Sequence, residues 1–94
     1  MKLIPPRPTF AQDMTADERA AMLEHVKYMR EMFAAGKILI YGPVMAASGG
    51  YGMGVFEVEN EEEARKLMEA DPTIKSGLNK FEFSPMRVGE ARGI

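Results

Sequence analysis

Apolar residues recur along the chain at two different spacings, one typical of strands and the other typical of helices. Strand-like segments lie at 1–4, 37–44, 51–59 and 78–88, and segment 37–44 is rich in β-branched and aromatic residues. Between them, residues 16–35 and 61–70 repeat apolar residues at helical spacing. The pattern predicts the order strand, helix, strand, strand, helix, strand, with loops over 10–14 and 73–77.

Polar residues mark where the two predicted helices begin and end. Thr15 and Glu18 form the capping-box pattern that begins a helix, and Gly36 suits the left-handed cap that ends it. Asn60 caps the second helix, which ends at Asp71 because the following proline disfavours helical geometry. The inward stripe of the first helix is apolar except for one histidine, and it consists of Met22, His25, Val26, Met29, Met32 and Phe33.

This order of elements predicts an α+β fold, the ferredoxin-like βαββαβ topology. Its simplest arrangement is a four-stranded antiparallel sheet with two helices on one face. In the second strand, alternation predicts that Ile38 and Ile40 share one face and that Leu39 and Tyr41 share the other. The sheet face without helices needs a cover, and we expect that cover to be a second copy in a homodimer.

Length, charge and composition limit the number of domains, the kinds of partner and the kinds of chemistry that this chain can have. With 94 residues the chain predicts one domain, 1–94, of a size that often gains stability by dimerising. The formal net charge of −2 argues against nucleic acid as a partner, because phosphate binding needs a basic surface. The absence of cysteine excludes disulfides and thiol nucleophiles. No apolar stretch approaches the ~20 residues of a membrane span and no signal peptide is recognisable, so we expect no membrane partner and a cytoplasmic location.

His25 and Asp71 are the candidate catalytic residues. His25 is the only histidine and lies on the inward stripe, so any imidazole chemistry must use it. Two helices on one sheet face would bring Asp71, at the end of the second helix, near the middle of the first. A carboxylate beside an imidazole orients the ring for acid–base work. Each residue also has a structural explanation: a hydrogen-bonded core histidine, and a turn-forming aspartate before proline.

A second group of residues is expected to line a small-molecule site. Gly42, Pro43 and Ser48 would shape the mouth of a cavity, and the hydroxyls of Tyr41 and Tyr51 would bind a polar ligand. Ordinary hairpin turns and sheet packing explain the same five residues. No helix follows the glycine-rich segment 49–54, which therefore fails as a phosphate loop. One histidine with scattered carboxylates does not form a usual metal set, so we expect neither metal nor cofactor.

Several short motifs, in this order and spacing, resemble the YCII-related (YciI-like) family over nearly the whole chain. They lie at residues 4–10, 24–29, 36–43, 49–52, 62–64, 70–72, 77–78 and 81–85. The resemblance implies a dimeric α/β-barrel in which two ferredoxin-like sheets face each other, with His25 and Asp71 as the family's proposed active-site pair. A relative acts as a dehydrochlorinase on a chlorinated hydroxyquinol. Thr73 and Met86 stand where many members have aromatic residues, which changes the shape of the pocket.

These observations favour a cofactor-independent enzyme of lyase or hydrolase type, acting on a small molecule, with hydroxylated aromatic molecules as the candidate class. His25 would transfer the proton, and Asp71 would hold and polarise it. The alternative is a non-catalytic small-molecule-binding or interaction module that uses the dimer cleft. A third hypothesis is a cofactor-free monooxygenase, which would need an electron-rich aromatic substrate and would consume oxygen.

Overall fold

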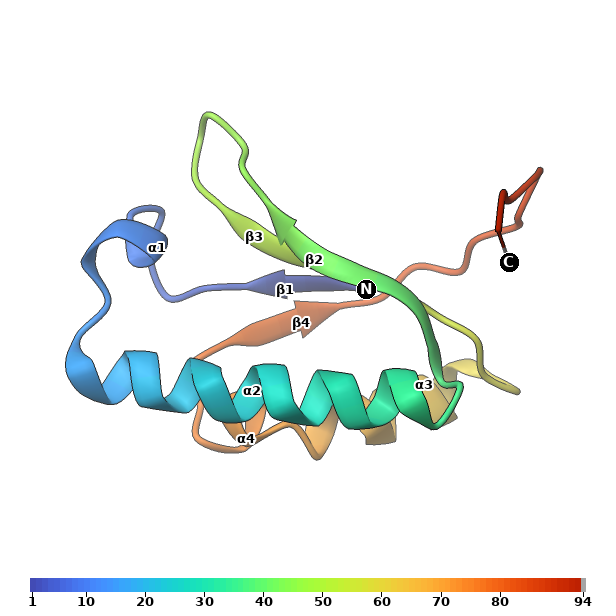
Figure 1. Cartoon of the computed structure of the whole chain (residues 1–94), viewed down its shortest axis with the longest axis horizontal. Helices are drawn as coiled ribbons and strands as arrows, with labels where there is room; N and C mark the ends of the chain where they lie inside the picture. Colours follow the sequence, from blue (N-terminus) through green and yellow to red (C-terminus); the bar gives the residue numbers. More distant parts are fainter. Residues whose placement is uncertain (94) are drawn as a thin grey trace.

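A four-stranded antiparallel sheet forms one layer of the structure, and helices cover one of its faces (Figure 1). The structure is a computed structural model that describes residues 1–93, so the last residue of the predicted domain 1–94 lies outside the described part. The strands are β1 (Lys2–Ile4), β2 (Ile38–Val44), β3 (Tyr51–Phe56) and β4 (Lys80–Glu82), in the order β2-β3-β1-β4. This arrangement confirms the predicted ferredoxin-like α+β fold.

Two long helices and two single-turn helices lie beside the sheet. The long helices are α2 (Ala16–Ala34) and α3 (Glu61–Glu69), and the short ones are α1 (Phe10–Asp13) and α4 (Pro72–Lys75). The loops predicted over 10–14 and 73–77 are therefore wrong, because one turn of helix is too short to produce a helical period in the sequence. Figure 1 shows α2 running along the length of the sheet, with α4 beneath it.

The start of α2 is fixed by hydrogen bonds that the sequence predicts. The Thr15 hydroxyl accepts from the Glu18 backbone N–H at 3.1 Å, and the Glu18 carboxylate accepts from the Thr15 N–H at 2.9 Å. The guanidinium of Arg7 donates to both carboxylate oxygens of Glu18, at 2.8 and 2.9 Å. These contacts confirm the capping box and hold the preceding loop against the first turn of α2.

The apolar core lies between α2 and the sheet. Met29 and Met32 of α2 pack against Ile38 of β2, and Tyr41 packs against the same cluster. A bulge at Leu39 shifts the strand register, so Ile38 is only 2% exposed whereas Ile40 is 59% exposed. The predicted sharing of one face by Ile38 and Ile40 is therefore wrong, because the extra residue turns the strand between them.

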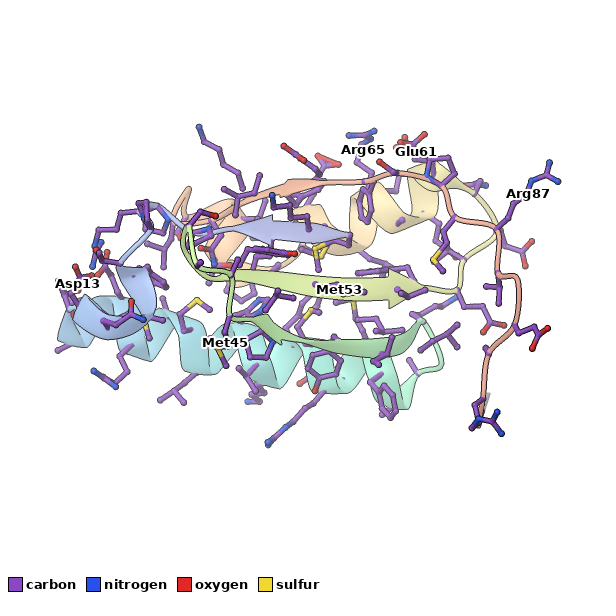
Figure 2. All side chains as sticks on the ribbon, turned by 90° about the horizontal axis from the view of Figure 1, so that it is seen from above. Asp13, Met45, Met53, Glu61, Arg65 and Arg87 are labelled. Atoms are coloured by element: carbon purple, nitrogen blue, oxygen red, sulfur yellow. The ribbon has the colours of Figure 1, made fainter. Side chains whose placement is uncertain are left out.

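The fourth strand is much shorter than the predicted segment 78–88. β4 pairs with β1 alone, and β1 offers only three residues before Pro5 ends it. β1 lies between β3 and β4, with Lys2 opposite both Met53 and Glu82. Beyond β4 the chain continues as an irregular tail across the end of the sheet (Figure 2).

The sheet face opposite the helices has no cover within residues 1–93. Figure 2 looks onto this open face, where Met53 lies on β3 near the middle of the sheet. Met53 is 45% exposed, and Ile40 of the neighbouring strand is also exposed. The ammonium of Lys2 lies 4.7 Å from the centroid of the Tyr51 ring.

Within residues 1–93, no helix combines the length and the apolar character needed to cross a membrane.

The turn between β2 and β3 depends on glycine at position 49. Gly49 has φ of +130°, and a Cβ built there would lie 2.9 Å from the Cβ of Pro8. Gly49→Ala should therefore lower the free energy of unfolding by about 1–3 kcal/mol. The matched control is Gly42→Ala in β2, where a Cβ would meet no atom within 4 Å. Urea denaturation of both variants tests this, and equal stabilities would contradict it.

Candidate active site

Four buried polar side chains meet where α2 lies against α4. Among residues 1–93, the buried polar and charged residues are His25, Asp71, Thr73 and Asn79. Hydrogen bonds connect all four into a single chain. The described part of the protein therefore gathers its buried polar side chains at one place, where α2 lies against α4.

The structure brings the two predicted catalytic residues together. His25 lies in α2, and Asp71 is the N-cap residue of α4. The Nδ1 atom of His25 lies 2.5 Å from Oδ2 of Asp71. Tyr28 joins α2 to α3, since its hydroxyl donates to the backbone carbonyl of Leu67 at 2.7 Å. Burial, and then the charge of Asp71, raises the pKa of Tyr28.

Asp71 is both the cap of α4 and the partner of the histidine. Its Oδ1 atom accepts from the backbone N–H of Thr73 at 2.8 Å and from the Thr73 hydroxyl at 2.7 Å. Pro72 occupies the first position of α4, where a missing N–H has no cost. Burial alone would raise the pKa of Asp71, but the hydrogen bonds from His25 and Thr73 outweigh burial and hold that pKa below its usual value. Asp71 is therefore a carboxylate at neutral pH.

Thr73 and Asn79 are members of the site that the sequence reasoning missed. Asn79 donates from Nδ2 to the Thr73 hydroxyl at 2.9 Å, and its backbone N–H donates to the Thr73 carbonyl at 3.1 Å. The Asp-Pro-Thr sequence carries a signal that could have identified Thr73, because an aspartate before proline caps a helix by accepting from the residue two positions on. Asn79 follows α4 and gives no comparable local signal.

The second ring nitrogen of His25 is the atom available to a ligand. Within residues 1–93, Nε2 has no hydrogen-bond partner. In the same residues, one side-chain nitrogen or oxygen atom is both buried and without a partner, and it is Oδ1 of Asn79, not Nε2 of His25. It follows that Nε2 reaches solvent, in agreement with the 10% exposure of the His25 side chain. When Nδ1 donates to Asp71, a neutral imidazole carries its lone pair on Nε2. The pair therefore presents one basic nitrogen at the surface.

The five residues predicted to line a ligand site are spread over β2, β3 and the turn between them. Tyr41 packs edge-on against Phe33 on the helix side of the sheet, with 6.2 Å between the ring centroids. Tyr51 lies on the open face, under the ammonium of Lys2. Gly42 and Pro43 pair with Met53 and Gly52, and Ser48 is exposed in the turn. No hydrogen bond among residues 1–93 connects these five to His25 or Asp71. Their role in binding stays a prediction.

A large hollow lies at the end of the sheet, away from the histidine. It has a volume of about 760 Å³ and is bordered by the sheet, α3 and the tail, with Met53, Val55, Phe83 and Val88 among its lining residues. A second hollow of about 480 Å³ lies beside Tyr28. Neither is lined by His25 or Asp71. Residues 1–93 also contain no cluster of three or more histidine and carboxylate side chains that could hold a metal ion.

The depressed pKa of Asp71 predicts a particular dependence of stability on pH. The ionised carboxylate stabilises the fold above its unfolded pKa of 3.8, and this contribution is lost as the pH falls through the lower folded value. Asp71→Asn should therefore lose less stability than the wild type between about pH 7 and about pH 3. Chemical denaturation at both pH values measures this. Asp17→Asn, at an exposed position of α2, is the control and should behave as the wild type does.

Comparisons with known proteins agree with the fold described above. The structure is similar to 5-chloro-2-hydroxyhydroquinone dehydrochlorinase (TftG) from Burkholderia phenoliruptrix AC1100, solved in complex with 2,5-dihydroxybenzoquinone. The TM-score is 0.65 and the sequence identity 23%, over 95% of this chain and 96% of that chain. No curated protein sequence matches the chain. The family model of the YCII-related domain matches residues 1–87, and the chain therefore belongs to the YCII-related family.

Proposed function

We propose that this protein is a cofactor-independent enzyme that removes a proton from a small hydroxylated aromatic molecule so that a leaving group departs. His25 is the base and Asp71 orients it. One observation carries the proposal: Nδ1 of His25 is held by a buried carboxylate while Nε2 reaches solvent. A base needs both features, because the first fixes the ring and the second gives the substrate access to the lone pair.

A dehydrochlorination would balance without a cofactor. When the chlorine-bearing carbon of a chlorinated hydroxyquinol takes up a proton, the resulting keto form can lose chloride. Two hydroxyl protons leave; one returns to the chlorine-bearing carbon and the other passes to solvent. Chloride departs with the bonding electron pair, so the net loss is HCl. Because the ring loses this electron pair with chloride, it is oxidised to a quinone and no external oxidant is required. His25 Nε2 would accept a hydroxyl proton and deliver it to the ring carbon.

The comparisons support the substrate class by analogy. The structural neighbour is named a dehydrochlorinase and holds a dihydroxybenzoquinone. At 23% identity this likeness establishes the fold alone, so the hydroxylated aromatic substrate is part of the proposal. We also propose a cytoplasmic location, as expected from the sequence. The candidate substrate contacts are the five residues of β2, β3 and the turn between them: Tyr41, Gly42, Pro43, Ser48 and Tyr51.

The open sheet face supports a homodimer as the working form. Met53 and Ile40 expose apolar side chains on this face, and Figure 2 shows no element covering it. A second copy stacked on it would bury this apolar surface between two sheets about 10 Å apart. The substrate cleft would then lie partly between the two copies.

Replacing the base should abolish turnover without unfolding the protein. His25→Gln should lower kcat/KM by about 100- to 10,000-fold, because glutamine cannot accept the proton. The assay is chloride release from 5-chloro-2-hydroxyhydroquinone, and Glu24→Gln at the exposed neighbouring position is the control. Turnover that survives in His25→Gln would refute the mechanism.

The same variant distinguishes the binding-module alternative. That alternative draws support from the burial of His25 and from the distance between the pair and the lining of the large hollow. If the pair is only structural, wild type should show no turnover and His25→Gln should lower the melting temperature sharply. Oxygen consumption measured in the same assay identifies a monooxygenase.

A charge on the open face should separate the dimer. Met53→Asp places a carboxylate where two sheets would meet, in an interface expected to bury about 1,200–2,000 Å². Sedimentation velocity should show a dimer for the wild type and a monomer for this variant. Leu23→Asp is the control, because Leu23 is 67% exposed and lies on α2 in the helix layer. A monomeric wild type would refute this part of the proposal.

A further inference from the structure

We propose that Thr73 and Asn79 are positioning residues that hold Asp71 in one orientation, so that His25 keeps its proton on Nδ1 and its lone pair on Nε2. This inference rests on the proposed function, since it concerns the same base. It assigns a role to two residues whose hydrogen bonds lead to Asp71.

Asn79 determines which atom donates and which accepts in these hydrogen bonds. Its Nδ2 atom lies 2.9 Å from the Thr73 hydroxyl and 3.4 Å from the sulfur of Met22. A thioether sulfur has no proton to donate, so the amide NH₂ group suits this position and the amide oxygen does not. The backbone N–H of Asn79 donates to the Thr73 carbonyl and fixes the asparagine beside the start of α4. Asn79 is therefore a donor to the Thr73 hydroxyl.

The hydroxyl of Thr73 accepts from Asn79 and in turn donates to Asp71. A hydroxyl has one proton, and when it accepts from Asn79 its own proton is free to point at Asp71. The Thr73 oxygen lies 2.7 Å from Oδ1 of Asp71, and the Thr73 backbone N–H donates to the same atom at 2.8 Å. Oδ1 thus receives two donors from one residue. The carboxylate cannot rotate about its Cβ–Cγ bond without losing both.

With Oδ1 held, Oδ2 can only face the histidine. Oδ2 lies 2.5 Å from Nδ1 of His25, and an ionised carboxylate can accept but not donate. Nδ1 must then carry the ring proton, which leaves the lone pair on Nε2. A carboxylate that rotated or took up a proton would allow the other tautomer, in which Nε2 carries the proton and cannot act as a base.

The unpartnered oxygen of Asn79 indicates what this position is selected for. Oδ1 of Asn79 is buried and has no hydrogen-bond partner within residues 1–93. An apolar residue of similar size would fill the same space without leaving a polar atom unsatisfied. An asparagine here is understandable if its amide NH₂ is needed to orient the Thr73 hydroxyl.

The test compares Thr73→Val, which removes only the hydroxyl, with Thr73→Ser, which keeps it. Carbon-13 NMR of the Asp71 carboxyl group should show a pKa raised by about one unit in Thr73→Val and a value near wild type in Thr73→Ser. Nitrogen-15 shifts of the single histidine should show more of the Nε2–H tautomer in Thr73→Val. Asn79→Leu should produce smaller shifts in the same directions, because the hydroxyl is then free to rotate.

Two results would overturn the inference. One is an Asp71 pKa and a His25 tautomer that do not change in Thr73→Val and Asn79→Leu. The other is a Thr73→Ser variant as altered as Thr73→Val, which would indicate a packing role. Neither readout depends on turnover. If the NMR shifts appear but the wild type shows no His25-dependent activity, the proposed function fails and the positioning network stands; if activity needs His25 but the shifts are absent, only this inference fails.

Discussion

A carboxylate without solvent contact must find hydrogen-bond donors inside the protein, and Asp71 meets this requirement where α3 ends and α4 begins. Two donors come from the turn that it caps, and the third is the histidine of α2. The middle of α2 must therefore lie against the start of α4. The hydrogen bond from Tyr28 to the carbonyl of Leu67 joins α2 to α3, the helix that precedes α4. The placement of the helix layer thus depends on satisfying one buried charge.

This arrangement is a costly way to fill the space between two helices. The unpartnered Oδ1 of Asn79 alone costs roughly 1–3 kcal/mol. Replacing a buried polar network by apolar side chains of similar volume is often neutral or stabilising. The apolar cluster of Met29, Met32 and Ile38 includes none of the four residues of this network. A small domain that carries such a cost in its helix layer is explained most simply by a chemical use for the ordered imidazole.

Capping and periodicity patterns in the sequence were enough to predict most of the fold and the His25–Asp71 pair, but not the residues that surround this pair. The capping box at Thr15 and the order of elements follow from local chemistry, and that order places Asp71 near His25. The bulge at Leu39 could not be predicted, because it depends on how β2 registers with β3. The short β4 follows from the length of its partner β1. Asn79 joins the site through a contact with Thr73 and Met22 that no local pattern encodes.

The position of β1 has a consequence for how the protein is made. β1 is the first strand to be synthesised, yet its neighbours are β3 and β4, which come from the second half of the chain. On the ribosome, α2 and the β2–β3 hairpin are complete while β1 still has one unpaired edge, and such an edge can pair with other chains. Asp71 also emerges late, since 46 residues separate it from His25. The sheet can therefore be completed only once β4 has emerged, and the His25–Asp71 pair can form only once Asp71 has emerged.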